Sequence, residues 1–153
     1  MCAHEHDIKP NLLLSIFGNK CPRCRRGKLF KHKNPYKLKT MMRMNDPCPV
    51  CGQVTDMEPG FYYGTSYVSY AVGIAISVAT FIAWWVLIGF SLDDNRFFWW
   101  MGVNAIILVG LQPILMRLAR TIWIYFFIRY SPNWGKGDVV KAERVNEQLK
   151  NAW

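Results

Sequence analysis

Two long apolar runs dominate the pattern of hydrophobic and polar positions along this chain. Residues 67–90, YVSYAVGIAISVATFIAWWVLIGF, contain no charged side chain, and residues 97–116, FFWWMGVNAIILVGLQPILM, form a second run of similar length. At about 1.5 Å per residue, a helix of either run is long enough to cross the ~30 Å of hydrocarbon in a bilayer. Because only residues 91–96 connect the runs, we predict a transmembrane hairpin of two antiparallel helices.

Aromatic side chains cluster at both ends of the predicted hairpin. One group lies near the connector and the other before the first run: Trp84, Trp85, Trp99 and Trp100, then Tyr62, Tyr63, Tyr67 and Tyr70. Such clusters are typical of the two membrane–water interfaces. The alternative is a buried helical pair in a soluble bundle, but 153 residues are too few to cover two such helices on all sides.

Small and polar residues interrupt the apolar runs. Ser69, Gly73 and Ser77 recur at every fourth position, a spacing that lets helix backbones approach closely in lipid. Their partner is either the second helix or another protein. Two polar residues and a proline also lie at membrane depth: Asn104, Gln112 and Pro113. We interpret them as an interhelical hydrogen bond and a kink rather than as a ligand site.

The second run is followed by residues 117–130, RLARTIWIYFFIRY. One unbroken helix over residues 97–130 would be about 50 Å long, well beyond the hydrocarbon thickness. Arg117 and Arg120 are therefore predicted to mark the membrane surface and to contact lipid or a partner. We expect residues 117–130 to lie flat as an interfacial helix, and a helix that continues straight out is the alternative. Residues 131–153 are predicted to form a cytoplasmic tail with one further helix.

The distribution of charge predicts the orientation of the hairpin. Residues 1–66 contain eleven Lys and Arg against five Asp and Glu, and residues 117–153 contain seven against three, within a net charge of +9. Basic flanks stay in the cytoplasm, so both termini are predicted to be cytoplasmic and the acidic connector external. The early apolar cluster in residues 1–19 is a short amphipathic segment without a cleavage site, so we expect no secretory signal.

Four cysteines form two C-x2-C pairs separated by 23 residues: Cys21, Cys24, Cys48 and Cys51. A two-residue gap lets both sulfurs of a pair face one centre, and four thiolates in a tetrahedron suit Zn²⁺. Pro22 and Pro49 occupy the same place in each pair, and Gly27 and Gly52 follow where a turn directs backbone N–H groups at sulfur. We predict a four-cysteine zinc ribbon, a small β domain of residues 20–57 that needs metal to fold.

Dithiol exchange and an iron–sulfur cluster are the other uses open to paired cysteines. A thioredoxin-like dithiol opens a helix after a strand, and residues 25–47 show no such unit. A reducing cytoplasm also disfavours lasting disulfides. A separate copper or nickel site at Cys2, His4 and His6 is a further alternative, against a frayed polar terminus.

The segment between the cysteine pairs is strongly basic. Arg25, Arg26 and Lys28 are predicted to contact anionic lipid or a partner, since each juxtamembrane cation contributes about 1 kcal/mol near such a surface. Some zinc ribbons bind nucleic acid through a basic face. We do not expect nucleic acid here, because the position beside the membrane already accounts for the charge.

Residues 58–66 form a short pre-membrane segment ahead of the first apolar run. Glu58, Gly60 and Gly64 are predicted to organise a turn there. The Glu58 carboxylate is expected to bond the N-terminal amides of the first helix or a basic residue of the ribbon.

The cysteine turn CPRCRRGKLF, the segment EPGFYYGTSYVSY and the paired apolar runs together resemble a bacterial membrane family, domain of unknown function 983. Its members carry a Cys-Pro-x-Cys pair followed by Gly-x-Leu-Phe, a second pair and two transmembrane helices. The resemblance covers residues 12–130 and implies a bacterial cytoplasmic (inner) membrane location. Some relatives are encoded among cytochrome oxidase biogenesis genes, which implies a role in assembling a membrane complex.

The sequence contains no Ser/His/acid set, no phosphate-binding glycine loop and no carboxylate pair. We therefore expect a non-enzymatic zinc-ribbon adaptor or assembly factor for a membrane complex. Its expected partners are the bilayer and either a membrane protein or a second copy of the chain. The alternative is a metal-handling or thiol-redox factor in respiratory oxidase biogenesis.

Overall fold

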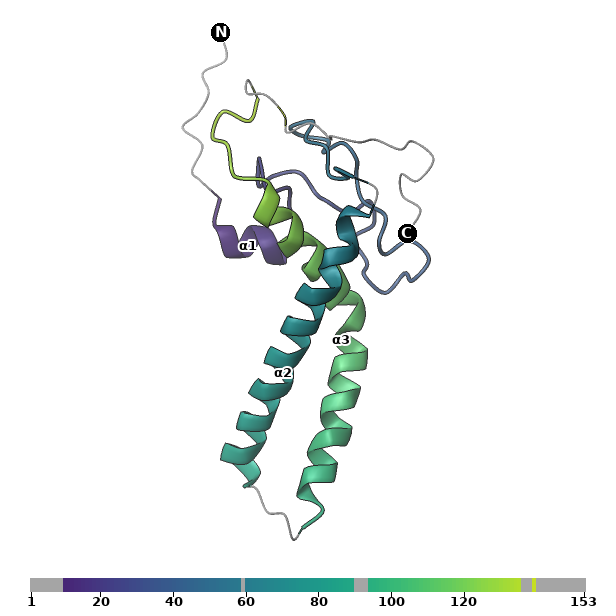
Figure 1. The fold of residues 1–153 in the computed structure, drawn as a ribbon, viewed down its shortest axis with the longest axis vertical. Coiled ribbons are helices and arrows are strands. Elements are labelled where there is room, and N and C mark those ends of the chain that lie inside the picture. Colours follow the sequence, from purple (N-terminus) through teal and green to yellow (C-terminus); the bar gives the residue numbers. More distant parts are fainter. Residues whose placement is uncertain (1–9, 59, 90–93, 136–138, 140–153) are drawn as a thin grey trace.

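The computed structural model describes residues 10–58, 60–89, 94–135 and 139. Its helices are α1 (Leu12–Phe17), the 3-10 helix η1 (Phe61–Gly64), α2 (Thr65–Ile88) and α3 (Arg96–Phe127). Figure 1 shows α2 and α3 side by side as a hairpin, with α1 and the cysteine-bearing loops gathered at one end. The predicted helical hairpin is confirmed. The predicted tail helix and the Cys2, His4 and His6 group lie outside the described residues.

Helices α2 and α3 are long and apolar enough to cross a membrane. Their outward surfaces are largely uncovered by protein: Ile106, for example, is 74% exposed. A contiguous apolar surface of this extent is unfavourable in water and favours contact with hydrocarbon or with another protein.

A polar bridge joins α2 to α3 in the middle of the apolar length. The Asn104 amide nitrogen donates to Ser77 Oγ at 3.2 Å, and Thr80 Oγ1 donates to Asn104 Oδ1 at 3.0 Å. Closer to the connector, the rings of Phe81 and Trp100 meet edge to face at 5.0 Å. The interhelical hydrogen bond predicted for Asn104 is confirmed.

We expect Asn104→Leu to lower the free energy of unfolding of the hairpin by about 1 kcal/mol, because both interhelical hydrogen bonds are lost. Reversible unfolding in mixed SDS micelles would measure this change. Gln112→Leu is the matched control, since Gln112 lines an open cleft and its replacement should be nearly neutral. Equal effects of the two substitutions would contradict a specific role for Asn104.

Part of the small-residue stripe faces a cleft rather than the neighbouring helix. Ser69 and Gly73 line a space of about 640 Å³ between α2 and α3. A Cβ added to Gly73 would meet no atom within 4 Å. Among the described contacts, Ser77 is the only residue of this stripe that hydrogen bonds to α3, where it accepts from Asn104.

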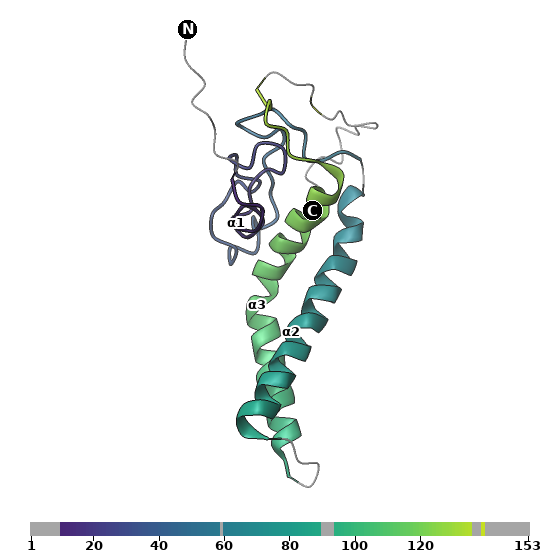
Figure 2. The same cartoon turned by 90° about the vertical axis from the view of Figure 1, so that its left-hand side faces the viewer.

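Helix α3 continues past Pro113 without a break as far as Phe127. The prediction that residues 117–130 lie flat as an interfacial helix is therefore wrong, and the alternative of a continuing helix holds. The helix continues because it packs on the cysteine domain: Ile124 and Ile128 are buried in the core of that domain. Figure 2 shows α1 and the loops on one side of upper α3 and α2 on the other. The extension thus has packing partners within the protein along its length.

The cysteine domain forms without regular strands. Between residues 10 and 58 the structure shows two isolated antiparallel bridges, Lys20 with Lys28 and Phe30 with Met44, and no strand. The β character predicted for this domain is therefore not confirmed. Its core contains few side chains of its own, and α3 completes that core.

Candidate metal centre

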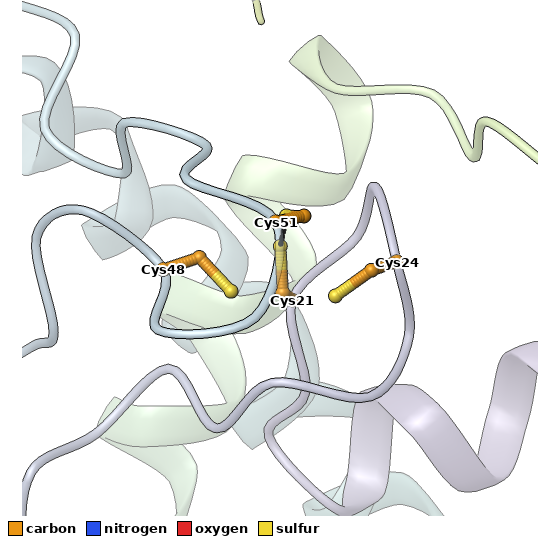
Figure 3. Close-up of side chains that lie close together, drawn as sticks. All are labelled: Cys21, Cys24, Cys48 and Cys51. Carbon is orange, nitrogen blue, oxygen red and sulfur yellow. Dashed lines mark hydrogen bonds between the residues drawn. The ribbon is translucent and has the colours of Figure 1, made fainter. Parts of the chain in front are cut away.

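The four cysteines of the two pairs converge on one point. Figure 3 shows Cys21, Cys24, Cys48 and Cys51 with their side chains directed toward a common centre. Their sulfur atoms all lie within 4.8 Å of one another, and Cys21 Sγ is 3.7 Å from Cys51 Sγ. Tetrahedral zinc, with Zn–S bonds of about 2.3 Å, separates its sulfurs by about 3.8 Å. These four residues could therefore hold a metal ion.

The first cysteine turn is closed by three hydrogen bonds. Arg25 N donates to the Cys21 carbonyl at 2.8 Å, and Cys21 N donates to the Gly27 carbonyl at 2.8 Å. Gly27 N lies 3.4 Å from Cys24 Sγ and donates to it. Such N–H groups stabilise a thiolate. The turn therefore presents a prearranged pair of sulfurs, with Pro22 buried at its second position.

The second turn resembles the first, with the same bond across four residues and a second bond that spans five residues instead of six. Gly52 N donates to the Cys48 carbonyl at 3.0 Å, and Cys48 N donates to the Gln53 carbonyl at 2.9 Å. Gly52 has a φ of 69°, and the residue in the same position of the first turn, Arg25, has a φ of 54°. Position by position, Gly52 thus corresponds to Arg25 rather than to Gly27, with which the sequence pairs it. Pro49 is exposed at the second position.

Gly27 has a different role, because it lies where the two turns meet. A Cβ at Gly27 would overlap Cys48 Sγ. We expect Gly27→Ala to weaken metal binding by at least ~10-fold, since substitutions that displace ligands through their supporting shell have effects of this size. Competition with a chromophoric chelator would measure the affinity.

Gly52→Ala is the matched control for this prediction. An added Cβ at Gly52 meets no atom within 4 Å, so the substitution carries only the strain of a left-handed backbone, about 1 kcal/mol. Equal metal affinities for the two alanine variants would contradict a contact role for Gly27.

Burial and mutual hydrogen bonds shift the ionisation of the thiols. The pKa of Cys24 is lowered, chiefly because Cys21 and then Cys48 hydrogen bond to its sulfur. The pKa of Cys21 is raised, chiefly by its hydrogen bonds with Cys24 and then Cys48. Burial is the main cause that raises the pKa of Cys51 to about 11. Without a cation the cluster therefore retains protons, which a metal ion must displace as it binds.

Arg117 does not face lipid as predicted. Only 4% of it is exposed, and its guanidinium donates from Nε to the Met41 carbonyl at 2.8 Å. It also donates to the carbonyls of Lys33 and Asn34, at 3.2 and 3.0 Å. Its charged centre lies 4.9 Å from the centroid of the Phe30 ring. Arg117 thus fastens the loop between the cysteine pairs to α3.

Arg120 and Arg25 are also buried, each 9% exposed. Arg120 donates to the Met42 carbonyl at 3.2 Å and lies 4.9 Å from the centroid of the Tyr62 ring. Arg25 donates to the Pro10 carbonyl at 2.9 Å. The lipid contact predicted for these two residues and for Arg117 is corrected accordingly: all three join parts of the protein. A buried guanidinium needs hydrogen-bond acceptors, and main-chain carbonyls supply one to each of Arg120 and Arg25, whose Nε atoms have no acceptor among the described residues.

Arg26 and Lys28, the other two cations predicted for lipid or partner contact, are exposed. The pattern that distinguishes Arg117 and Arg120 from them is helical: the two arginines share one face of α3 with Ile124, at spacings of three, four and seven. That shared face is the signal in the sequence by which their inward direction could have been found.

The pre-membrane segment forms a tight turn into α2. Gly60 has a φ of 83°, and Phe61 N donates to the Glu58 carbonyl at 3.0 Å. A Cβ at Gly64 would overlap the Trp123 ring, whose Nε1 donates to the Phe61 carbonyl at 2.8 Å. The Glu58 side chain is exposed and makes no hydrogen bond or ion pair with any residue that the structure describes. The role predicted for its carboxylate is therefore not observed.

Fold and centre together define a class of protein: a membrane-type helical hairpin that carries a four-cysteine, metal-capable domain fastened to one end. No family model, curated protein or solved structure matches this chain. The function is accordingly inferred from the geometry.

Proposed function

We propose that this chain is a two-span protein of the bacterial cytoplasmic membrane, related to domain of unknown function 983. In this proposal its cysteine domain holds a structural Zn²⁺ and serves as a non-enzymatic adaptor in the assembly of a membrane complex. The observation that carries the proposal is the convergence of four sulfurs in a domain whose core is completed by α3. A metal centre joined in this way sets the position of a docking surface relative to the membrane helices.

Zinc is the metal that best suits the centre. Four thiolates are soft ligands, and a closed set of four protein ligands is typical of structural zinc rather than of catalytic zinc, which keeps one open position. Cys21, Cys24 and Cys48 are buried. Because the domain has so small a core, binding of the metal would supply much of its folding free energy.

Several contacts besides the arginines attach the domain to α3. Thr121 Oγ1 lies 2.7 Å from Asn19 Oδ1, and the Tyr125 hydroxyl donates to the Lys20 carbonyl at 3.1 Å. These bonds connect the segment before the first cysteine pair to the final turns of α3. Because these bonds fix the cysteine domain relative to α3, they support a role in which the domain presents a surface to a partner at a constant distance from the membrane helices.

A second candidate, exchange of metal or thiol redox chemistry, is favoured by one observation. Cys51 is less buried than the other three ligands. A partly exposed sulfur gives an incoming thiol or metal carrier a point of attack.

One purification separates the two candidates. The full chain would be isolated from its native membranes in mild detergent, with metal content and co-purifying membrane proteins measured together. One tightly held zinc per chain, unchanged by mild oxidant, together with a membrane complex that is lost in a metal-free cysteine variant, supports the adaptor. Readily exchanged copper, or a disulfide that cycles, would support the second candidate instead.

A further inference from the structure

The loop between the cysteine pairs runs back along α3 toward its apolar length. The Tyr36 hydroxyl donates to the Gly110 carbonyl at 3.0 Å. Gly110 lies two turns before Arg117, about 10 Å along the helix axis. Arg117 in turn holds the carbonyls of Lys33, Asn34 and Met41. Both arms of the loop are therefore fixed at the end of the apolar run, and its tip reaches back along the last turns of that run.

The tip of this loop combines apolar and cationic side chains. Leu38 is 70% exposed, and Tyr36 is exposed beside it. Residues 31–43 contain no acid, and four exposed lysines surround the tip: Lys31, Lys33, Lys37 and Lys39. Apolar groups bordered by lysines suit the boundary between hydrocarbon and anionic headgroups, because lysine buries its stem and keeps its charge among the phosphates.

Helix α1 offers a second surface of the same kind. Leu14 and Phe17 are 71% and 68% exposed, whereas Ser15 is buried, the reverse of a helix that packs on its own domain in water. Asn19, just after α1, lies 2.7 Å from Thr121, one turn beyond Arg117. In Figures 1 and 2, α1 lies near the level at which the cysteine-bearing loops give way to the helical hairpin.

We propose that α1 and the 33–39 loop dock the cysteine domain on the bilayer surface. Leu14, Phe17 and Leu38 enter the boundary of the hydrocarbon, and the loop lysines bind anionic phosphate headgroups. The inference rests on the proposed function, because it requires α2 and α3 to span the bilayer. Because α1 and the 33–39 loop would both contact the bilayer, the cysteine domain could not tilt freely relative to α2 and α3.

Photocrosslinking of the full chain in vesicles tests this docking surface. Benzoylphenylalanine would replace Leu14 or Leu38 in zinc-loaded protein, in phosphatidylcholine vesicles with or without phosphatidylglycerol. After irradiation, mass spectrometry would identify lipid adducts. Val50, an exposed apolar residue on the second cysteine turn, is the matched negative position, and Ile106 on α3 is the positive one. We expect roughly tenfold more lipid adduct at Leu14 and Leu38 than at Val50, since groups below the headgroups meet acyl chains.

The positive position separates failure of this inference from failure of the membrane proposal. Lipid adducts at Ile106 without adducts at Leu14 and Leu38 would overturn the docking surface and leave the hairpin in the bilayer. No lipid adduct at Ile106 would overturn both. Adducts to a second copy of the chain at Leu14 or Leu38 would identify a protein interface in place of a lipid one.

Charge substitutions test the headgroup contact separately. With phosphatidylglycerol present, Lys37→Gln and Lys39→Gln are each expected to lower the adduct at Leu38 by up to about fivefold, the equivalent of ~1 kcal/mol per lysine. In pure phosphatidylcholine the same substitutions should change little. Equal effects in both kinds of vesicle would overturn the role of the lysines in binding anionic headgroups. Each variant would first be shown to retain its metal.

Discussion

Cys24→Ser is expected to release the metal ion and to unfold the cysteine domain while α2 and α3 remain helical. Cys24 is fully buried at the centre of the cluster, and a serine hydroxyl does not replace a thiolate ligand. Structural zinc contributes about 10–16 kcal/mol to comparable small domains, so its loss exceeds what the remaining core can supply. Metal content per chain and protease digestion of the loops between residues 19 and 58 would measure the two effects.

Cys2→Ser is the control for the loss of a thiol. Cys2 is not part of either C-x2-C pair, so this variant should keep its metal and its protease resistance. A Cys24→Ser chain that is free of metal, yet as resistant to protease as the parent, would show that the centre is not needed for folding.

Arg117→Met is expected to have the second-largest effect, a loss of about 3 kcal/mol in the free energy of unfolding of the cysteine domain. The substitution removes three hydrogen bonds from a charged donor and the contact with the Phe30 ring. Water can reach parts of this loop, which limits the cost below the sum of three buried bonds. Denaturant unfolding in detergent, followed by metal release, would measure the change, and hydrogen exchange should rise in residues 33–41.

Two further arginine variants sharpen this test. Arg117→Lys keeps the charge but lacks the planar set of donors, so it should fall between the parent and Arg117→Met. Arg129→Met removes an exposed arginine and should be nearly neutral. If Arg129→Met and Arg117→Met destabilised the domain equally, general charge rather than the three carbonyl contacts would be the cause.

The cysteine centre was predictable from the sequence because its geometry is local. A C-x2-C pair brings two sulfurs to one side of a turn, whatever surrounds it, and two such pairs need only one further approach to meet. The contact of Gly27 with Cys48 Sγ belongs to that approach. This contact joins residues 21 positions apart, and the sequence alone does not show which glycine lies against the sulfur of the other cysteine pair.

The fate of residues 117–130 could not be predicted from length and hydropathy. Those two properties compare a helix with the bilayer alone, so the segment was expected to turn into the headgroup layer. In the structure this segment packs on a protein surface in place of the headgroup layer. That surface is formed by residues near the other end of the chain, around Leu29, Phe30 and Met44. Packing of Ile124 and Ile128 on that surface decides in favour of the continuing helix.

By itself, the sequence determined the helical hairpin, the Asn104 bridge and the grouping of the four cysteines. These follow from short-range rules: hydrocarbon thickness sets the length of an apolar helix, and a two-residue spacing sets the direction of paired sulfurs. Only the tertiary structure decided which acceptors Arg117 and Arg120 bind and that the cysteine domain shares its core with α3. An arginine binds whichever acceptors lie within reach, and here those acceptors are loop carbonyls more than 70 positions away in the chain.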